Sequence, residues 1–462
     1  MVENHIIPKF STSDKLIWGL ASFGTSLIAG VYAAMLVMFF HVYLELDPVL
    51  IAIAAILYAI WNAINDPLFG FMSDKTKGKR GRRIPYMQFT APFLALFFIV
   101  IWFVPPKWDD FGIFWWMLIT MLLYDTAYTI IGLVYSALLP EITEDDSERG
   151  ELQKYNSLFY LFGAIFGFLI PDLLRPKAGE TNLFPLYIGM IVVGIASAIC
   201  IVVTTLRFKE RPEFTQVDEP LGLVDSVKYT FKSKAFLILT AANFMSILFQ
   251  QILLSYLFYL ADYVMRVSTV ILILSIFLGL IIGVFFANVF ANKFGVVKAN
   301  QILLIIGAIP LIMLPFIPLM LIYLCLFLGG FGLSGPLVLT NVLYAQVADE
   351  DETKSGVRRE ASFFGTNAMI TKPAQSIAIA IGPLLLALAG FETGGKIILD
   401  QPESALFMIK VLVGLIPGIA MVIGALILLF YPLKGKYLKE IQDRVLKMHV
   451  DKQQKLAKKQ IG

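Results

Sequence analysis

Twelve apolar stretches, each long enough to cross a lipid bilayer, run through this chain of 462 residues. A hydrocarbon core of about 30 Å requires about 20 predominantly apolar residues in a helix. Because a helix satisfies its backbone hydrogen bonds within each span, the sequence predicts an all-α membrane protein. The predicted spans cover residues 16–41, 49–71, 84–105, 112–139, 155–174, 182–206, 235–261, 268–291, 299–322, 324–347, 363–391 and 405–432.

The composition supports this class, because only 15% of the residues are charged and 58% are hydrophobic. A soluble domain carries about 25% charged residues. Cys200 and Cys325 both lie in apolar runs, where they are expected to act as small hydrophobic residues rather than as a disulfide. The three histidines are scattered, so the sequence predicts no cofactor and no metal other than a coupling ion.

The distribution of lysine and arginine predicts that both termini are cytoplasmic, since positive charge concentrates in the inner loops. With this orientation, the N-terminus, the inner loops and the C-terminal tail hold most of the 37 basic residues. Lys372 lies within a span. The outer loops hold the remaining basic residues, which are Lys107, Arg175, Lys177, Arg266, Lys396 and Lys410. We expect a multi-pass protein of the plasma membrane.

The longest polar break, 207–234, falls between the sixth and seventh spans and divides the chain into two halves. The predicted domains are an N-terminal six-helix bundle (1–206), a cytoplasmic linker (207–234), a C-terminal six-helix bundle (235–432) and a basic cytoplasmic tail (433–462). Two pseudo-symmetric halves around a cavity at the membrane midplane are typical of secondary transporters.

Two charged residues lie inside apolar runs, Asp66 in the second span and Lys372 in the eleventh. A charge at the bilayer centre costs roughly 2.5–3.5 kcal/mol on insertion scales. Such residues usually face a protein-lined cavity and handle an ion or a substrate. Asn62 and Asp66 are four residues apart and therefore share a helix face, with Asn65 beside it. These oxygen ligands suit sodium, and a lone carboxylate suits a proton equally well.

Three polar segments carry a resemblance to a known family. They are NAINDPLFGFMSDKTKGKRGRRIPYM at 62–87, YSALLPEITEDDSERGELQKYN at 135–156 and AQVADEDETKSGVRREASFFG at 345–365, after the second, fourth and tenth spans. In order and placement they resemble the glycoside–pentoside–hexuronide cation symporters, the melibiose-permease-like branch of the major facilitator superfamily. The resemblance covers nearly the whole chain. It implies the major facilitator fold and cation-coupled sugar or glycoside symport by alternating access.

The resemblance also implies a cation site. The family pattern has two carboxylates four residues apart on the second span and a threonine on the fourth. Here Asn62 stands at the first carboxylate, Asn65 and Asp66 match the pattern, and Thr129 matches the threonine. One charge is therefore missing. The coupling ion is left open between sodium, a proton and no ion at all.

The sugar site departs further from the family pattern. Ser26 and Gly132 stand where the family has acidic residues, and Asn156 or Ser157 stands where it has an arginine. Lys372 matches the family's lysine on the eleventh span. Since related eukaryotic members carry lysophospholipids, a lysolipid or other amphipathic substrate is the alternative to a sugar. An uncoupled facilitator is a further alternative.

Asp125 is a candidate to compensate for a lost charge, because it lies in the middle of the fourth span, seven residues before Gly132 and therefore on nearly the same helix face. We expect Asp125 or Asp66 to pair with Lys372 at the substrate site. Alternatively, Asp125 is a structural residue that hydrogen-bonds a tyrosine. The remaining substrate-binding candidates are polar or aromatic groups on predicted spans, which in a bundle also serve as interhelical hydrogen-bonding groups: Tyr128, Gln250, Asn367 and Ser26.

Charged residues after the second, fourth and tenth spans are predicted to form cytoplasmic gates. Charge pairs that form only when the inner side is shut would favour one state of a two-state bundle. Alternatively they are solvated loop charges. The predicted gating residues are Asp74, Arg82, Arg83, Glu148, Arg149, Asp349, Glu352, Arg358, Arg359 and Glu360.

Other classes of protein fit less well. An intramembrane prenyltransferase would need a carboxylate three residues after Asp66, whereas the next is Asp74. We therefore expect no enzyme. A non-transporting membrane sensor is the remote alternative. The expected partners are a small-molecule substrate and membrane lipids, with no nucleic acid, and the expected assembly is a monomer.

Overall fold

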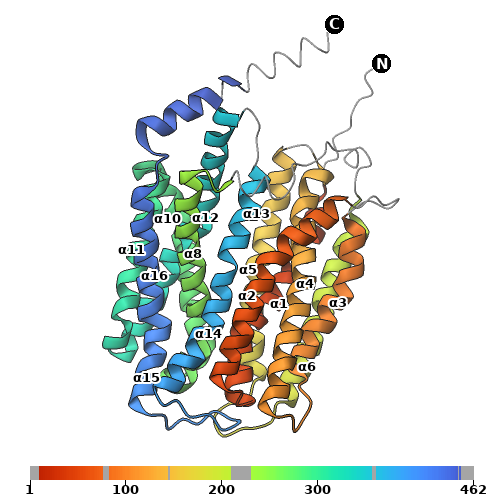
Figure 1. Ribbon diagram of the computed structural model, residues 1–462, viewed down its shortest axis with the longest axis vertical. Coiled ribbons are helices and arrows are strands. Elements are labelled where there is room, and N and C mark those ends of the chain that lie inside the picture. Colours follow the sequence, from red (N-terminus) through yellow and green to blue (C-terminus); the bar gives the residue numbers. More distant parts are fainter. Residues whose placement is uncertain are drawn as a thin grey trace. The chain divides into compact units, whose positions relative to one another are not determined.

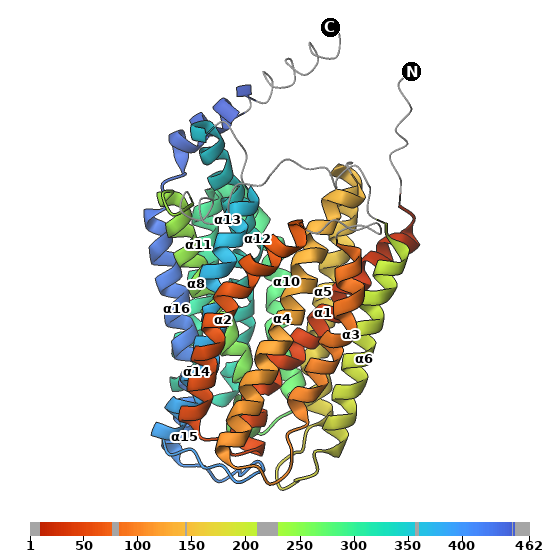
Figure 2. The ribbon, with the colours of Figure 1, turned by 45° about the vertical axis from the view of Figure 1, so that its right-hand side comes forward.

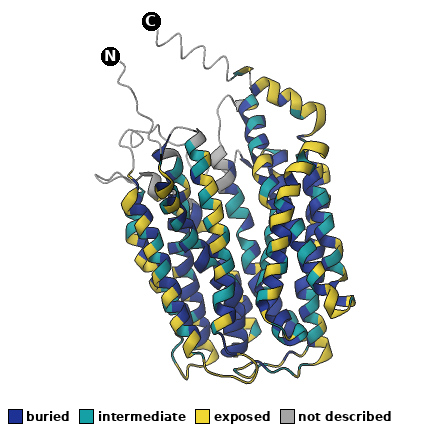
Figure 3. Ribbon diagram, turned by 180° about the vertical axis from the view of Figure 1, so that it is seen from behind, coloured by how far each residue is buried: buried dark blue, intermediate teal, exposed yellow. Residues whose placement is uncertain are grey.

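A computed structural model describes residues 10–75, 83–143, 146–209, 230–355, 360–445 and 447–448. Its regular elements are helices, with no strand among those residues (Figure 1). Within the described part, twelve helical segments are long and apolar enough to span a membrane, as predicted. Exposed residues alternate with buried ones along the length of the helices (Figure 3), and Phe89 on α3 is 72% exposed. Large apolar side chains open to the surroundings suit a lipid environment.

The first six spans follow the predicted order. They are α1 (Thr12–Met38) continued by η1 (Phe39–Tyr43), α2 (Pro48–Lys75), α3 (Ile84–Trp102), α4 (Asp110–Ile142), α5 (Asp146–Leu174) and α6 (Phe184–Arg207). The seventh to tenth spans are α8 (Lys234–Ser255) with α9 (Leu257–Tyr259) and η3 (Leu260–Met265), α10 (Thr269–Phe294), α11 (Val296–Met313) and α12 (Ile322–Ser355). The last two are α13 (Glu360–Thr371) with α14 (Pro373–Leu388), and α15 (Glu403–Lys410) with η6 (Val411–Leu415) and α16 (Ile416–Ile427).

The chain packs as two compact units whose boundaries differ from the two predicted halves. Unit 1 comprises 1–220, 251–273 and 375–413, and unit 2 comprises 221–250, 274–374 and 414–462. Two segments of the second half, 251–273 and 375–413, thus pack with the first half. The predicted bundle boundaries stay a prediction.

In unit 1, α1 packs closely against α5, and the two helices lie side by side in both views (Figure 1, Figure 2). Small residues allow the close approach, since a Cβ built on Gly167 would lie 2.7 Å from the Cα of Gly30. Helix α2 packs on α4, and α3 packs on α4 and α6. Unit 2 uses the same device, because a Cβ on Gly332 of α12 would lie 2.8 Å from the Cα of Gly307 of α11.

Two of the spans that pass from one unit to the other are irregular near the crossing. Lys372 separates α13 from α14 in the eleventh span, where its N–H still donates to the Ala368 carbonyl at 3.0 Å. Pro373 follows directly and has no N–H, so regular helical bonding stops there. In the twelfth span the π-helical turn η6 contains the boundary after Val413. Lys372 therefore marks a discontinuity in its helix.

Candidate functional site

A buried polar cluster joins α2 and α4 within unit 1. At its centre is Asp125 of α4, whose side chain is almost fully buried. Asn65 of α2 donates a hydrogen bond from Nδ2 to the Asp125 carboxylate and a second one, of 3.3 Å, to Thr129 Oγ1. Tyr58 of α2 donates its hydroxyl to the same carboxylate at 3.0 Å. One carboxylate thus holds two donors from the neighbouring helix.

Helical periodicity explains why these residues meet. Asp125 and Thr129 are four residues apart on α4, and Tyr58, Asn62 and Asn65 follow one another at spacings of four and three on α2. Side chains at these spacings lie on one face of a helix. Facing polar stripes on two apolar helices are therefore buried together.

Two amide oxygens in this cluster have no hydrogen-bond partner among the described residues. Asn62 is fully buried, and neither its Oδ1 nor its Nδ2 has a hydrogen-bond partner among the described residues. Asn65 Oδ1, also buried, lacks one as well. Leaving a buried polar group unsatisfied costs about 1–3 kcal/mol. Amide, hydroxyl and carboxylate oxygens are the ligands that hard cations prefer, so the donor set fits a sodium ion or an ordered water.

Asp66 is buried on the same helix, four residues after Asn62. An aromatic row lies beside Asp125: Tyr32 stacks on Tyr124 with ring centroids 4.5 Å apart, and Tyr124 on Tyr128 at 5.8 Å. Tyr128, like Asp125, belongs to α4, three residues further along the helix. The structure brings together Asn65, Thr129 and Asp125, which the sequence divided between a cation site and a substrate site.

Tyr58 is not among the site residues predicted from the sequence. Its signal was the spacing Tyr58, Asn62, Asn65, which continues the polar stripe of α2 by one turn. An alternative reading of Asp125 was a hydrogen bond to a tyrosine, and that bond is present. The same carboxylate also accepts a hydrogen bond from Asn65, so the tyrosine contact is one part of the polar cluster.

Ser26 lies in the tight α1–α5 interface. Its hydroxyl donates to the Phe23 carbonyl at 3.2 Å, and a Cβ on Gly163 would lie 2.0 Å from Ser26 Oγ. This packing disfavours contact between Ser26 and a substrate. Substrate binding by Ser26 stays a prediction. At Gly132, by contrast, an added Cβ would meet nothing within 4 Å. The position of the family's second sugar-binding acid is thus open but carries no side chain.

The other substrate candidates lie in unit 2. Asn367 of α13 accepts hydrogen bonds on Oδ1 from Asn243 Nδ2, at 3.1 Å, and from the Tyr344 hydroxyl. Gln250, the last residue of the segment 221–250 of unit 2, is half-buried, and Lys372 is half-buried at the break after α13. Asp125 belongs to unit 1, whereas Lys372 belongs to unit 2. The predicted pairing of these two residues stays a prediction.

The predicted gating residues are described in part. Glu148 accepts from the Phe10 N–H at 3.3 Å and lies 3.4 Å from Lys15 Nζ, and Arg149 Nε donates to the Thr143 carbonyl at 2.8 Å. Glu352 is buried and Asp349 half-buried on α12, and Arg83 immediately precedes α3. Arg82, Arg358 and Arg359 and the side chains of Asp74 and Glu360 lie outside the described residues. The gating roles stay predictions.

Comparison with known proteins places the chain among transporters. A family model described as MFS/sugar transport protein matches residues 17–435. The sodium-dependent lysophosphatidylcholine symporter 1 of Gallus gallus is 25% identical, over 86% of this chain and 82% of that protein. The sphingosine-1-phosphate transporter MFSD2B of Xenopus tropicalis is 24% identical over 83% and 80%, and an uncharacterized symporter of Synechocystis sp. is 23% identical over 92% and 95%.

Solved structures confirm the predicted fold. The nucleoside transporter NupG superposes with a TM-score of 0.62 at 14% identity, over 92% of this chain and 100% of that one. A bacterial homologue of human drug peptide transporters gives a TM-score of 0.64 at 13% identity, over 94% and 100%. At these identities the likeness establishes the fold alone.

Proposed function

This chain belongs to the MFS/sugar transport protein family of the major facilitator superfamily, and from that premise we propose that it is a cation-coupled symporter of a lysolipid or a related amphipathic molecule. Transport proceeds by alternating access. The relatives named above for lysophosphatidylcholine and sphingosine-1-phosphate support this substrate class. The expected sugar substrate gains no such support, although the chain keeps its resemblance to the glycoside–pentoside–hexuronide branch.

The sequence departures favour the same substrate class. Two positions that carry acids in the sugar pattern hold Ser26, which is packed between helices, and Gly132, which has no side chain. Without those carboxylates a sugar loses its strongest hydrogen-bond acceptors. Lys372 remains, and an ammonium group suits a phosphate-bearing headgroup. Asn367, Gln250 and Tyr128 complete the proposed substrate contacts.

Coupling rests on one observation: Asn65 bridges Asp125 and Thr129, while Asn65 Oδ1 and both amide atoms of Asn62 have no hydrogen-bond partner in the part of the chain that the structure describes. We assign Asp125 to the cation site rather than to the substrate site. Its charge replaces the carboxylate that Asn62 lacks, and Asp66 supplies the second one. Sodium is the favoured ion, since several relatives carry sodium dependence in their names.

Ion binding would act on the conformational equilibrium. An ion held by oxygens of both α2 and α4 stabilises the arrangement in which these helices present their ligands together. It shifts the equilibrium only to the extent that it binds one state more tightly than the other. Filling the site with a cation also neutralises buried carboxylates, which lowers the cost of moving the loaded protein through its closed states.

A thermal-shift series on the purified protein tests this function. Lysophosphatidylcholine, a disaccharide and a glucuronide are compared in sodium chloride and in choline chloride at two pH values. A ligand at about 100 times its dissociation constant stabilises the folded state by about 2.7 kcal/mol. We expect stabilisation by the lysolipid, larger in sodium. A response to the sugars alone would reinstate the sugar substrate.

Two further outcomes separate the remaining alternatives. Equal stabilisation in both salts and at both pH values would indicate an uncoupled facilitator. Ligand binding without counterflow in vesicles would indicate a sensor. The protein is an integral multi-pass membrane protein. A plasma-membrane location, cytoplasmic termini, a monomeric state and the absence of catalysis remain part of what we propose.

A further inference from the structure

A buried arginine joins three chain segments at one end of unit 1. Lys15 and Glu148 bring the beginnings of α1 and α5 together, so η1 and the end of α5 lie at the other end. There the Arg175 side chain, directly after α5, is fully buried. It donates from both terminal nitrogens to Asp262 of η3, from Nη2 to Asp172 Oδ1 at 2.8 Å and from Nη2 to Thr269 Oγ1 at 3.2 Å.

The surroundings hold this guanidinium in its charged form. Burial opposes the charge, but the hydrogen bonds and the charge of Asp262 outweigh burial and raise the pKa of Arg175 above its ordinary value. The cation also lies 4.5 Å above the centroid of the Phe258 ring. Removing one partner of a buried ion pair is strongly destabilising, because it leaves an uncompensated buried charge. The ion pairs of Arg175 are therefore expected to stabilise this arrangement strongly.

The two carboxylates that bind Arg175 differ in how they are attached. Asp172 lies three residues before Arg175, in the last turn of α5, so this pair persists whenever the end of α5 is intact. Asp172 is further bound by Lys177 Nζ and Ser268 Oγ, each at 3.0 Å. Asp262, in contrast, belongs to a segment 87 residues away in the sequence. If that segment moved off, Arg175 would keep a carboxylate and would not become an uncompensated buried charge.

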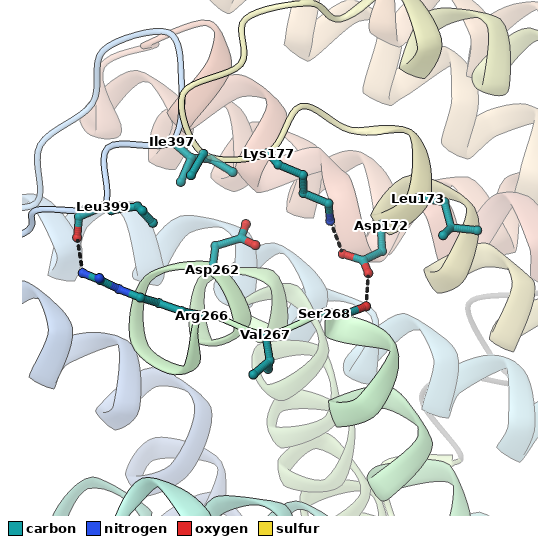
Figure 4. Close-up of a pocket in the computed structure, with 10 residues that line it drawn as sticks. Asp172, Leu173, Lys177, Asp262, Arg266, Val267, Ser268, Ile397 and Leu399 are labelled. Atoms are coloured by element: carbon teal, nitrogen blue, oxygen red, sulfur yellow. Dashed lines mark hydrogen bonds and ion pairs between the residues drawn. The ribbon is translucent and has the colours of Figure 1, made fainter.

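The Asp262 side of this cluster borders a pocket that solvent can enter. A pocket of 450 Å³ is lined by Asp172, Asp262, Lys177, Arg266 and the neighbouring 397–399 loop (Figure 4). Asp262 would therefore be released into water rather than into an apolar interior. Arg266 contributes no carboxylate pair in this arrangement, since its Nη2 donates to the Leu399 carbonyl at 3.4 Å.

Two further contacts, both made by side chains of η1, accompany the arginine cluster. The Tyr43 hydroxyl donates to the Pro176 carbonyl at 3.0 Å, closing η1 onto the end of α5. His41 Nδ1 lies 2.9 Å from the Tyr259 hydroxyl, and its ring stacks on Phe391. His41, like Arg175, thus connects the first half of the chain to segments of the second half that pack in unit 1.

We infer that the Arg175–Asp262 pair is a releasable lock, which holds the segment 257–273 against the ends of α1 and α5, while the Arg175–Asp172 pair stays in place when the lock opens. The lock defines a state closed at this end of unit 1. Opening requires Asp262, and the residues that follow it, to leave the guanidinium.

Thiol labelling of the full-length protein tests the lock. Cys200 and Cys325 are replaced by serine, and Ala261→Cys places a thiol at a fully buried position beside Asp262. The purified protein reacts with a water-soluble maleimide in detergent, so neither membrane sidedness nor transport enters the measurement. With Asp262→Asn we expect labelling at least about tenfold faster, within the range of typical conformational couplings. The matched control, Arg266→Gln, alters a charge on the same pocket and should leave the rate unchanged.

Two further variants keep the result interpretable. Thr269→Val removes only the hydroxyl that accepts from Arg175 and should raise the labelling rate modestly. This variant tests the lock if Asp262→Asn fails to fold. Asp172→Asn removes the charge of the lasting partner but keeps an amide oxygen that can accept from Ser268 of the segment 257–273, so we expect lower thermal stability without a matching rise in labelling. Equal labelling of folded Asp262→Asn, Thr269→Val and Arg266→Gln would overturn the lock and leave the proposed transport function untouched.

Discussion

The hydroxyl of Tyr58 and the carboxylate of Asp125 are joined by a hydrogen bond of 3.0 Å between α2 and α4. Hydrogen bonds from two donors on a neighbouring helix fix the direction of a carboxylate. The carboxylate is therefore held ready, and the Asn65 amide that shares it also reaches Thr129. This arrangement makes Asp125 the central residue of the proposed cation site.

Replacing Asp125 with asparagine should uncouple transport from the cation. The variant keeps the volume of the side chain and removes its charge, so we expect sodium-driven uptake to fall by at least about tenfold, on the scale of a coupling free energy of 1–3 kcal/mol. Tyr58→Phe should give a smaller loss. Uptake into vesicles under an inward sodium gradient, compared with uptake in sodium-free buffer, measures both, with Asp400→Asn, at an exposed loop position, as the control. Normal sodium dependence in Asp125→Asn would refute this role.

Replacing Asn62 with leucine should have opposite effects with and without the ion. Both amide atoms lack partners in the described structure, and removing an unsatisfied buried polar group relieves about 1–3 kcal/mol. We therefore expect a higher melting midpoint in sodium-free buffer and a reduced further shift on adding sodium. Differential scanning fluorimetry with a sodium titration measures both quantities. A lower midpoint in sodium-free buffer would show that Asn62 is a structural residue.

Much of the proposed cation site follows from the sequence, because helical spacing determines which residues of one helix share a face. Asn62, Asn65 and Asp66 were grouped in this way, and a family resemblance added Thr129. Asp125 was expected at the substrate site instead. Spacing along α4 gives its face but not its partner on the neighbouring helix, and that partner, Asn65, appears only once α2 and α4 are packed.

The Arg175 cluster could not be predicted for a related reason. In the sequence, Asp172, Arg175 and Lys177 are ordinary charges at the end of a span, typical of a solvated loop. The burial of Arg175 depends on Asp262 and Thr269, which are 87 and 94 residues away. A one-dimensional pattern of apolar runs contains no information about that contact.

Ser26→Ala should leave transport unchanged, since the Ser26 hydroxyl bonds a carbonyl of its own helix and lies against Gly163. Gly163→Ala should instead destabilise the fold by about 1–3 kcal/mol, because its Cβ would lie 2.0 Å from Ser26 Oγ and 2.5 Å from the Phe23 carbonyl oxygen. Substrate titration of uptake tests the first variant and thermal melting tests the second. A raised KM in Ser26→Ala would return this residue to the substrate site.

Lys372→Ala should separate substrate binding from ion binding. Lys372 lies at the break after α13 in unit 2, whereas Asn65, Asp125 and Thr129 lie in unit 1. If Lys372 binds a phosphate-bearing headgroup, the variant should lose stabilisation by lysophosphatidylcholine and retain the shift produced by sodium alone. Asp125→Asn should show the reverse pattern.

The matched control for Lys372 is Lys396→Ala, which removes a lysine from an exposed loop and should change neither response. Thermal shifts with each ligand alone, and with both together, complete the comparison across the three variants. Loss of the sodium response in Lys372→Ala would contradict two separate sites, because it would make this lysine part of the ion-dependent cluster. Retention of both responses would remove Lys372 from the substrate site and direct attention to Asn367 and its partners Tyr344 and Asn243.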